Sequence, residues 1–213
     1  MKIMIAVFLS ILSIFVFNAA PAGWFRDYDE PERITTRRVS MLQAPVLLLF
    51  FYMATDQLIC FFLVQLAIAD VCYYILPAPW ICAIASCGVL KLAAPGCAAP
   101  GAGAAGILSA AGPAADRLIA AAWPLLLWFA ATALAAMLGK PPAFGFGDAK
   151  LFSALGLAFG ASPSLQIFAA ACLTAGAAAP LFLLSKEKQL PFAPFVLIGY
   201  IIVCRLSSFI GAN

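Results

Sequence analysis

Two aspartates, Asp70 and Asp148, are the residues of this chain whose type and surroundings could do chemistry. Asp70 ends the apolar run FFLVQLAIAD, and Asp148 stands directly before the apolar run beginning AKLFSALGLAFG. An ionisable residue in or at a membrane-spanning segment is costly, so a functional role is the default interpretation. Two carboxyl groups in unequal environments suit hydrolysis, because one can hold a proton while the other takes one from water. The alternative is that each acid only caps a helix, and Asp148 in front of a helical run suits an N-cap.

The neighbours of Asp148 favour the functional interpretation. Gly145 and Gly147 flank Phe146 in the stretch FGFGDAKL, and glycine permits close approach of another backbone. We therefore expect an extended peptide to fit against the carboxylate. The positive end of the following helix favours the anion of Asp148, whereas Asp70, at the end of its own helix, experiences the opposite effect.

Several other chemistries are excluded by composition. The chain has no histidine, which removes Ser-His and Cys-His catalysis and histidine-based zinc sites. Its seven cysteines form no CxxC pair, so we expect neither a metal nor another cofactor. The net charge of +3 is spread over loops and forms no basic stripe, so nucleic acid is not an expected partner.

The elements that position the two acids belong to a membrane protein. Hydrophobic residues make up 65% of the chain, charged residues 10%, and the mean hydropathy is +1.06. Apolar runs separated by short polar or Pro/Gly stretches predict transmembrane helices. The fold class is therefore all-α and polytopic, with a lipid bilayer as partner and one membrane-embedded domain over residues 1–213.

We expect eight spans. They cover about 2–23, 44–55, 57–72, 80–94, 118–139, 149–161, 164–184 and 192–210. The first also fits a secretory signal peptide, but Arg26 and the arginines after it favour a retained span with residues 24–43 as a cytoplasmic loop. Most Lys and Arg residues then fall inside, and both acids come to the cytoplasmic edge of the membrane.

Three stretches resemble the type IV prepilin peptidases, a family of membrane aspartic proteases with a Gly-x-Gly-Asp motif. FGFGDAKLFSALGLAFG resembles that motif and its helix, and ADVCYYILP resembles the family's first-aspartate motif, in which Asp70 precedes Pro77. LPFAPFVLIGY at 190–200 resembles the Pro-Phe-Gly-Pro-Phe segment before the last helix, with Ala193 in the glycine's place. The motifs follow the family's order along the chain.

The resemblance implies a Gly-x-Gly-Asp protease fold in the bacterial inner membrane with Asp70 and Asp148 as the catalytic pair. Its substrates would be prepilins or pseudopilins of a type IV pilus or type II secretion system. They would be cut after a glycine between the basic leader and the hydrophobic helix. Larger family members carry a zinc-binding insert after the first span and methylate the new amino terminus. Residues 24–43 contain no cysteine, so we expect a short form that acts only as a peptidase.

The remaining candidates and alternatives stay open at this point. Lys150 could hold a substrate carbonyl, although a lysine that only marks the inner side of the membrane is the preferred interpretation. The same acids would also suit a small proton-coupled transporter. A third alternative is an inert scaffold of a pilus or secretion machine. The oligomeric state is left open.

Overall fold

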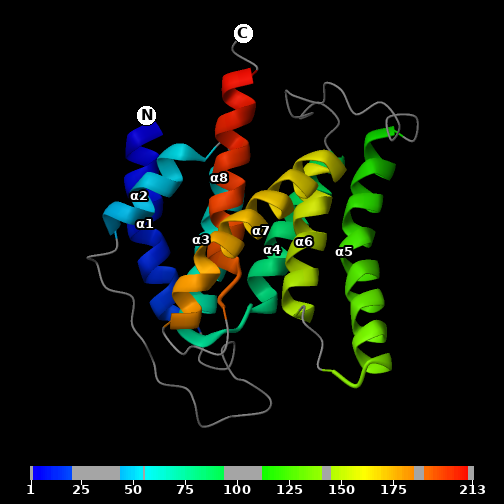
Figure 1. Ribbon diagram of the computed structural model, residues 1–213. Helices are drawn as coiled ribbons and strands as arrows, with labels where there is room; N and C mark the ends of the chain where they lie inside the picture. The colour runs from blue at the N-terminus through cyan, green and yellow to red at the C-terminus, as the bar shows by residue number, and fades with distance from the viewer. Residues whose placement is uncertain are drawn as a thin grey trace. The chain divides into compact units, whose positions relative to one another are not determined.

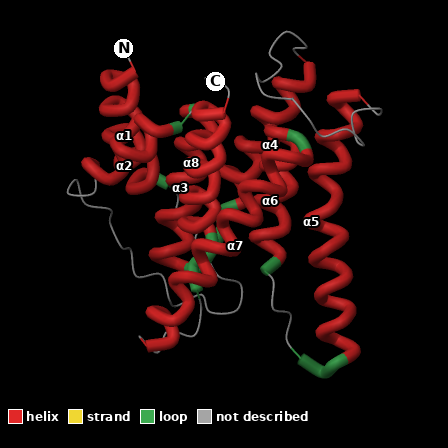
Figure 2. The backbone as a smooth tube through the Cα atoms, turned by 45° about the horizontal axis from the view of Figure 1, so that its top comes forward, coloured by secondary structure: helices red, strands yellow, loops and turns green. Residues whose placement is uncertain are grey.

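The computed structural model describes residues 2–20, 44–54, 56–93, 112–140, 145–184 and 190–210. These residues form helices joined by short connections, and none of them lies in a strand (Figure 2). The expected cytoplasmic loop over 24–43 falls outside the described residues. So does the Gly/Ala/Pro-rich stretch 94–106.

The described residues contain eight helices (Figure 1). They are α1 (Lys2–Ala19), α2 (Ala44–Met53), α3 (Gln57–Tyr73), α4 (Ala78–Ala93), α5 (Gly112–Met137), α6 (Phe146–Phe159), α7 (Ala161–Leu184) and α8 (Ala193–Ile210). The prediction of an all-helical chain is confirmed, and each helix falls on an apolar segment identified from the sequence.

Among the described residues, three helices are long and apolar enough to cross a membrane. They include Lys2–Ala19, Ala114–Met137 and Ala161–Leu181, whereas α3, α4 and α8 are shorter apolar helices. The 10-residue helix α2 is only about 15 Å long, half the thickness of a hydrocarbon core. The chain is therefore consistent with a helical membrane protein, and the number of eight spans stays a prediction.

Four helices begin earlier than expected, two of them being α4 at Ala78 and α7 at Ala161. Helix α5 starts at Gly112 and so includes Asp116, which the sequence had suggested as its outer boundary. Helix α6 starts at Phe146, so Gly147 and Asp148 lie inside its first turn. The first turn of a helix has no intrahelical partners for its N–H groups, so glycine and polar residues cost little there.

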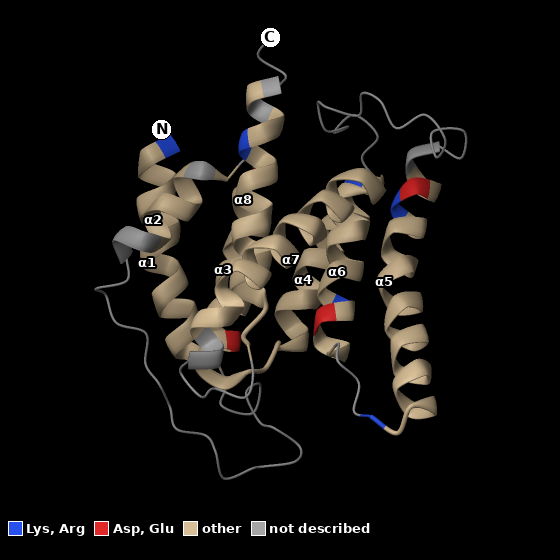
Figure 3. Ribbon diagram, viewed as in Figure 1, with Lys and Arg blue, Asp and Glu red and all other residues tan. Residues whose placement is uncertain are grey.

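The helices pack into two compact units, and each is described by itself. The first contains Met1–Trp80 and Ala170–Asn213, and the second contains Ile81–Ala169. In the described residues of both units, acidic and basic side chains lie near helix ends and leave the middle of each helix without a charged side chain (Figure 3). This distribution is expected of helices whose central turns lie in lipid.

Polar and aromatic contacts join α1 to α3 in the first unit. The fully buried Gln65 donates through Nε2 to Ser13 Oγ at 2.6 Å and to the Ser13 carbonyl at 3.1 Å. Nearby, the Phe17 ring stacks on Trp80 and Tyr73, with centroids 5.9 and 6.4 Å apart. Hydrogen bonds between apolar helices are a usual means of holding them together in a membrane.

Glycines bring the helices of the second unit into close contact. A Cβ at Gly88 of α4 would lie 2.8 Å from the backbone of Leu157 and Ala158 in α6. A Cβ at Gly156 of α6 would collide with the carbonyl of Ala120 in α5. Small residues at such positions let helix backbones approach each other.

Candidate active site

Asp70 is a buried acid in the last turn of α3. Its residue is 7% exposed, and its Oδ2 accepts a hydrogen bond of 2.7 Å from the backbone N–H of Ala193. The sequence predicted the position of Asp70 near the end of a helix but not this partner. A carboxylate bound by a backbone N–H is held in one orientation, which both a structural and a catalytic acid require.

Two helix ends act on the Asp70 carboxylate with opposite effect. The carboxyl end of α3 disfavours negative charge, as the sequence suggested. The amino end of α8 favours it, because Ala193 is the first residue of that helix and its N–H has no partner within the helix. The sequence-based expectation counted only the first effect and was therefore incomplete.

The segment that contacts Asp70 is LPFAPF at 190–195, one of the three family-like stretches. Ala193 is 1% exposed and Pro191 is also buried, so the segment is fixed against the first unit. Pro194 suits the first turn of α8 because it needs no hydrogen-bond partner there. This proline is a signal in the sequence that could have indicated a helix start, and hence an available N–H, near Ala193.

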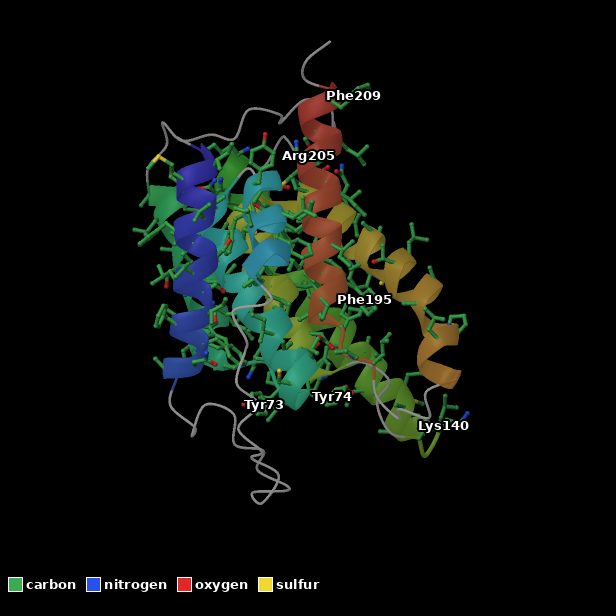
Figure 4. The ribbon with its side chains drawn as sticks, turned by 90° about the vertical axis from the view of Figure 1, so that its left-hand side faces the viewer. Tyr73, Tyr74, Lys140, Phe195, Arg205 and Phe209 are labelled. Atoms are coloured by element: carbon green, nitrogen blue, oxygen red, sulfur yellow. The ribbon has the colours of Figure 1, made fainter. Side chains whose placement is uncertain are left out.

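Pro77 lies in the link between α3 and α4. Helix α3 ends at Tyr73, and Tyr74 adopts a left-handed conformation with φ 55°, from which its N–H donates to the Asp70 carbonyl at 2.9 Å. Pro77 is buried directly before α4 begins. The expected break between these helices is confirmed. Tyr73 and Tyr74 lie at the opposite end of the first unit from Arg205 and Phe209 (Figure 4).

Asp148 occupies the third position of α6 and not the N-cap. The N-cap is Gly145, which is extended with φ −73° and ψ 143°, and its carbonyl accepts the N–H of Ala149 at 3.2 Å. The side chain of the half-buried Asp148 lies close to Gly145. A Cβ at position 145 would be only 3.2 Å from Asp148 Oδ2. Gly145 thus leaves space beside the carboxylate, whereas Gly147 is an ordinary helical residue and not part of a hinge.

Lys150 is exposed, and its ammonium group lies over the ring of Phe146 at 4.1 Å from the centroid. The other contact of Phe146 is with Trp128 of α5, whose ring centroid is 4.6 Å away. These contacts brace the amino end of α6 against α5. The first of these contacts gives Lys150 a local packing partner, and both interpretations of this residue stay predictions.

Asp116 offers a structural comparison for Asp70. Its Oδ2 accepts the N–H of Ala161, the first residue of α7, at 3.1 Å. Asp70 makes the same kind of contact with the first residue of α8. Gly160, with φ +87°, leaves room for the Asp116 carboxylate, since a Cβ there would collide with it. Capping of a neighbouring helix is therefore a geometry that this chain uses more than once.

Asp70 belongs to the first unit and Asp148 to the second. The structure brings Asp70 together with the LPFAPF segment, and Asp148 together with Gly145. That Asp70 and Asp148 lie together at one site stays a prediction. Within the described ranges, no cluster of three or more His, Cys, Asp and Glu side chains could hold a metal ion.

Other polar candidates have local roles. Asp56 caps its own helix by accepting the N–H of Ile59 at 3.1 Å, as the sequence suggested. Its backbone N–H and carbonyl both bond the Tyr200 hydroxyl of α8, at 3.0 and 2.9 Å. Arg205 is exposed toward the carboxyl end of α8 (Figure 4).

Comparison with known proteins finds no match to this chain. No protein-family model, curated protein or solved structure matches the chain significantly.

Proposed function

We propose that this protein is a membrane aspartic endopeptidase that removes the leader peptide from prepilins or pseudopilins. Asp70 and Asp148 form its catalytic pair, and the bond after a glycine, between the basic leader and the hydrophobic helix, is cleaved. The enzyme acts in the bacterial inner membrane at the cytoplasmic face. It uses no metal and no other cofactor.

One observation carries the proposal. The stretches ADVCYYILP and LPFAPFVLIGY, which resemble two motifs of one protease family, meet through the 2.7 Å hydrogen bond between Asp70 and Ala193. Nothing in the spacing of the two stretches requires such contact. The third stretch supplies a second acid, Asp148, whose carboxylate lies so close to Gly145 that a Cβ there would be 3.2 Å from Oδ2.

The reaction requires the two carboxyl groups to be in different protonation states. The ionised carboxylate accepts a proton from water as the water oxygen attacks the scissile carbonyl, and the protonated partner donates to the carbonyl oxygen. The tetrahedral intermediate then breaks its C–N bond, and a proton passes to the departing amine. The pair titrates as a unit, so each acid depends on the other.

The test is co-expression with a prepilin and measurement of leader removal by a mobility shift. Asp70→Asn keeps an oxygen that can accept the Ala193 N–H but cannot serve as a general base, so the fold survives and processing is lost. Asp148→Asn gives the same loss. Asp116→Asn is the matched control, because it makes the equivalent replacement at an acid that contacts only the start of α7, and its processing stays normal. Normal processing by either Asp70→Asn or Asp148→Asn refutes the assignment.

A second candidate is an inert scaffold of a pilus or secretion machine. It is favoured by the likeness between the Asp70–Ala193 and Asp116–Ala161 contacts, since both carboxylates bond the first N–H of another helix. For a scaffold, Asp70→Asn and Asp116→Asn leave assembly equally intact. For a peptidase, only Asp116→Asn does.

A further inference from the structure

A groove between α1 and α2 is a feature of the first unit that the proposed peptidase does not use. It encloses about 310 Å³ and is lined by Ile3, Leu48, Leu49 and Tyr52. Its volume is within the roughly 300–1,000 Å³ of small-molecule sites. Three of its four lining residues are aliphatic, so an occupant must present a hydrocarbon chain to it.

The groove has a cation at one side. The Lys2 ammonium lies 5.7 Å from the centroid of the Tyr52 ring. Tyr52 also lines the groove, so the positive charge of Lys2 lies beside the groove. Lys2 is exposed and opens α1, a helix long enough to cross a membrane, which places its ammonium at the level of lipid head groups.

A second cation lies at the same end of the first unit. The described part of the first unit has four charged residues, Lys2, Asp56, Asp70 and Arg205. Helix α1 begins and α8 ends at the same end of this unit (Figure 1), and Arg205 lies toward that end of α8 (Figure 4). Asp56 at the start of α3 is engaged with the N–H of its own helix. This end of the unit therefore offers two exposed cations to an anion.

We propose that the first unit binds an anionic phospholipid, with an acyl chain in the groove of Ile3, Leu48, Leu49 and Tyr52 and the phosphate beside Lys2. A second copy of the chain is a poorer occupant. Placed symmetrically with the same orientation in the membrane, it would bring its own Lys2 toward the first, and like charges would oppose the contact. The proposal does not depend on the proposed peptidase activity.

The test compares phosphatidylglycerol and phosphatidylcholine of identical chains by native mass spectrometry of the full-length protein in detergent. A lysine near a lipid surface contributes roughly fivefold in affinity, so the wild type retains phosphatidylglycerol about fivefold better. Lys2→Gln lowers this preference about fivefold, and, because Lys2 is exposed, the helix packing is undisturbed. Leu49→Trp fills the groove and lowers retention of both lipids. Lys140→Gln and Leu126→Trp, at exposed positions of the second unit, are matched controls that change neither.

Four results would overturn the proposal, and the fourth comes from a competition experiment. One is an unchanged lipid preference in Lys2→Gln, and another is an equal effect of the control variants. The third is a dimer mass that disappears in Leu49→Trp, which would assign the groove to a second copy. Free glycerol phosphate serves as competitor: if it displaces the bound lipid, the head group alone is recognised and the groove has no part in binding.

Discussion

The carboxylate of Asp70 accepts the backbone N–H of Ala193 at 2.7 Å, and both residues are buried. This bond ties the end of α3 to the start of α8, two helices that are far apart in sequence. It gives an otherwise unpaired N–H a partner at a buried helix start and fixes the orientation of the acid. Positioning of Asp70 is therefore a consequence of how α8 begins.

The first prediction separates the hydrogen bond of Asp70 from its charge. Asp70→Ala leaves the buried Ala193 N–H without an acceptor, which costs about 1–3 kcal/mol in the free energy of unfolding. Asp70→Asn keeps an acceptor and loses only the favourable interaction of a charge with the helix end, about 0.3–1 kcal/mol. Thermal unfolding in detergent measures both. Equal destabilisation by Asn and Ala would show that the hydrogen bond contributes nothing.

The second prediction concerns the space beside Asp148. Gly145→Ala places a methyl group 3.2 Å from Asp148 Oδ2, so the carboxylate must shift by a few tenths of an ångström. A misplaced catalytic group lowers the rate strongly, so we expect leader removal to fall about tenfold or more. Stability changes little, because Gly145 is exposed and has φ −73°, which alanine also adopts. Wild-type rates in Gly145→Ala would mean that the carboxylate needs no free space on this side.

Apolar runs were sufficient to predict the helices from the sequence. In a membrane, the backbone N–H and C=O groups of a run such as LVQLAIA find no water to bond. They must form hydrogen bonds within the segment, so an apolar composition is enough to predict a helix. The start of α6 was missed because the first turn of a helix tolerates Gly147 and Asp148 at little cost. The start of α5 was missed because Asp116, the fifth residue of that helix, was taken as its outer boundary.

The partner of Asp70 was beyond sequence reasoning for a different reason. It is a backbone N–H, which every residue except proline has, and it becomes available at Ala193 only because a helix begins there. Asp148, by contrast, interacts with residues adjacent in sequence, so its link to Gly145 could be anticipated. Contacts that depend on how distant helices cross leave no pattern in residue spacing.

The third prediction tests the close packing of α5 against α6. Gly156→Ala forces a methyl group into the carbonyl of Ala120, and separating the two backbones costs about 1–3 kcal/mol or more. Gly176→Ala in α7 is the matched control, since no atom lies within 4 Å of the added methyl group. A helical glycine replaced by alanine without a clash gains about 0.4–1 kcal/mol. Unfolding midpoints should therefore move in opposite directions, and a shift of the same sign in both variants would contradict the packing.

The fourth prediction tests the polar link between α1 and α3. Ser13→Ala removes the hydroxyl that accepts from Gln65 at 2.6 Å, and interhelical hydrogen bonds in membranes contribute about 0.6 kcal/mol on average, with a maximum near 1.7. Gln65→Met removes the other partner while keeping its volume. A double-mutant cycle should give a coupling energy of this size. Strictly additive effects would show that the two side chains do not interact.

The fifth prediction asks whether Asp70 and Asp148 act as one catalytic unit. Removing either member of an acid–base pair stops the proton transfers that both serve, so each Asn variant should lose about 100-fold to 10,000-fold in the rate of leader removal. Replacing both together should cost no more than the worse single change, because effects within one catalytic unit are far from additive. Rates are measured with purified protein and a radiolabelled prepilin, at protein amounts matched by quantitative blotting. If the double variant instead loses the product of the two single losses, the acids contribute independently, and Asp70 keeps only its structural bond to Ala193.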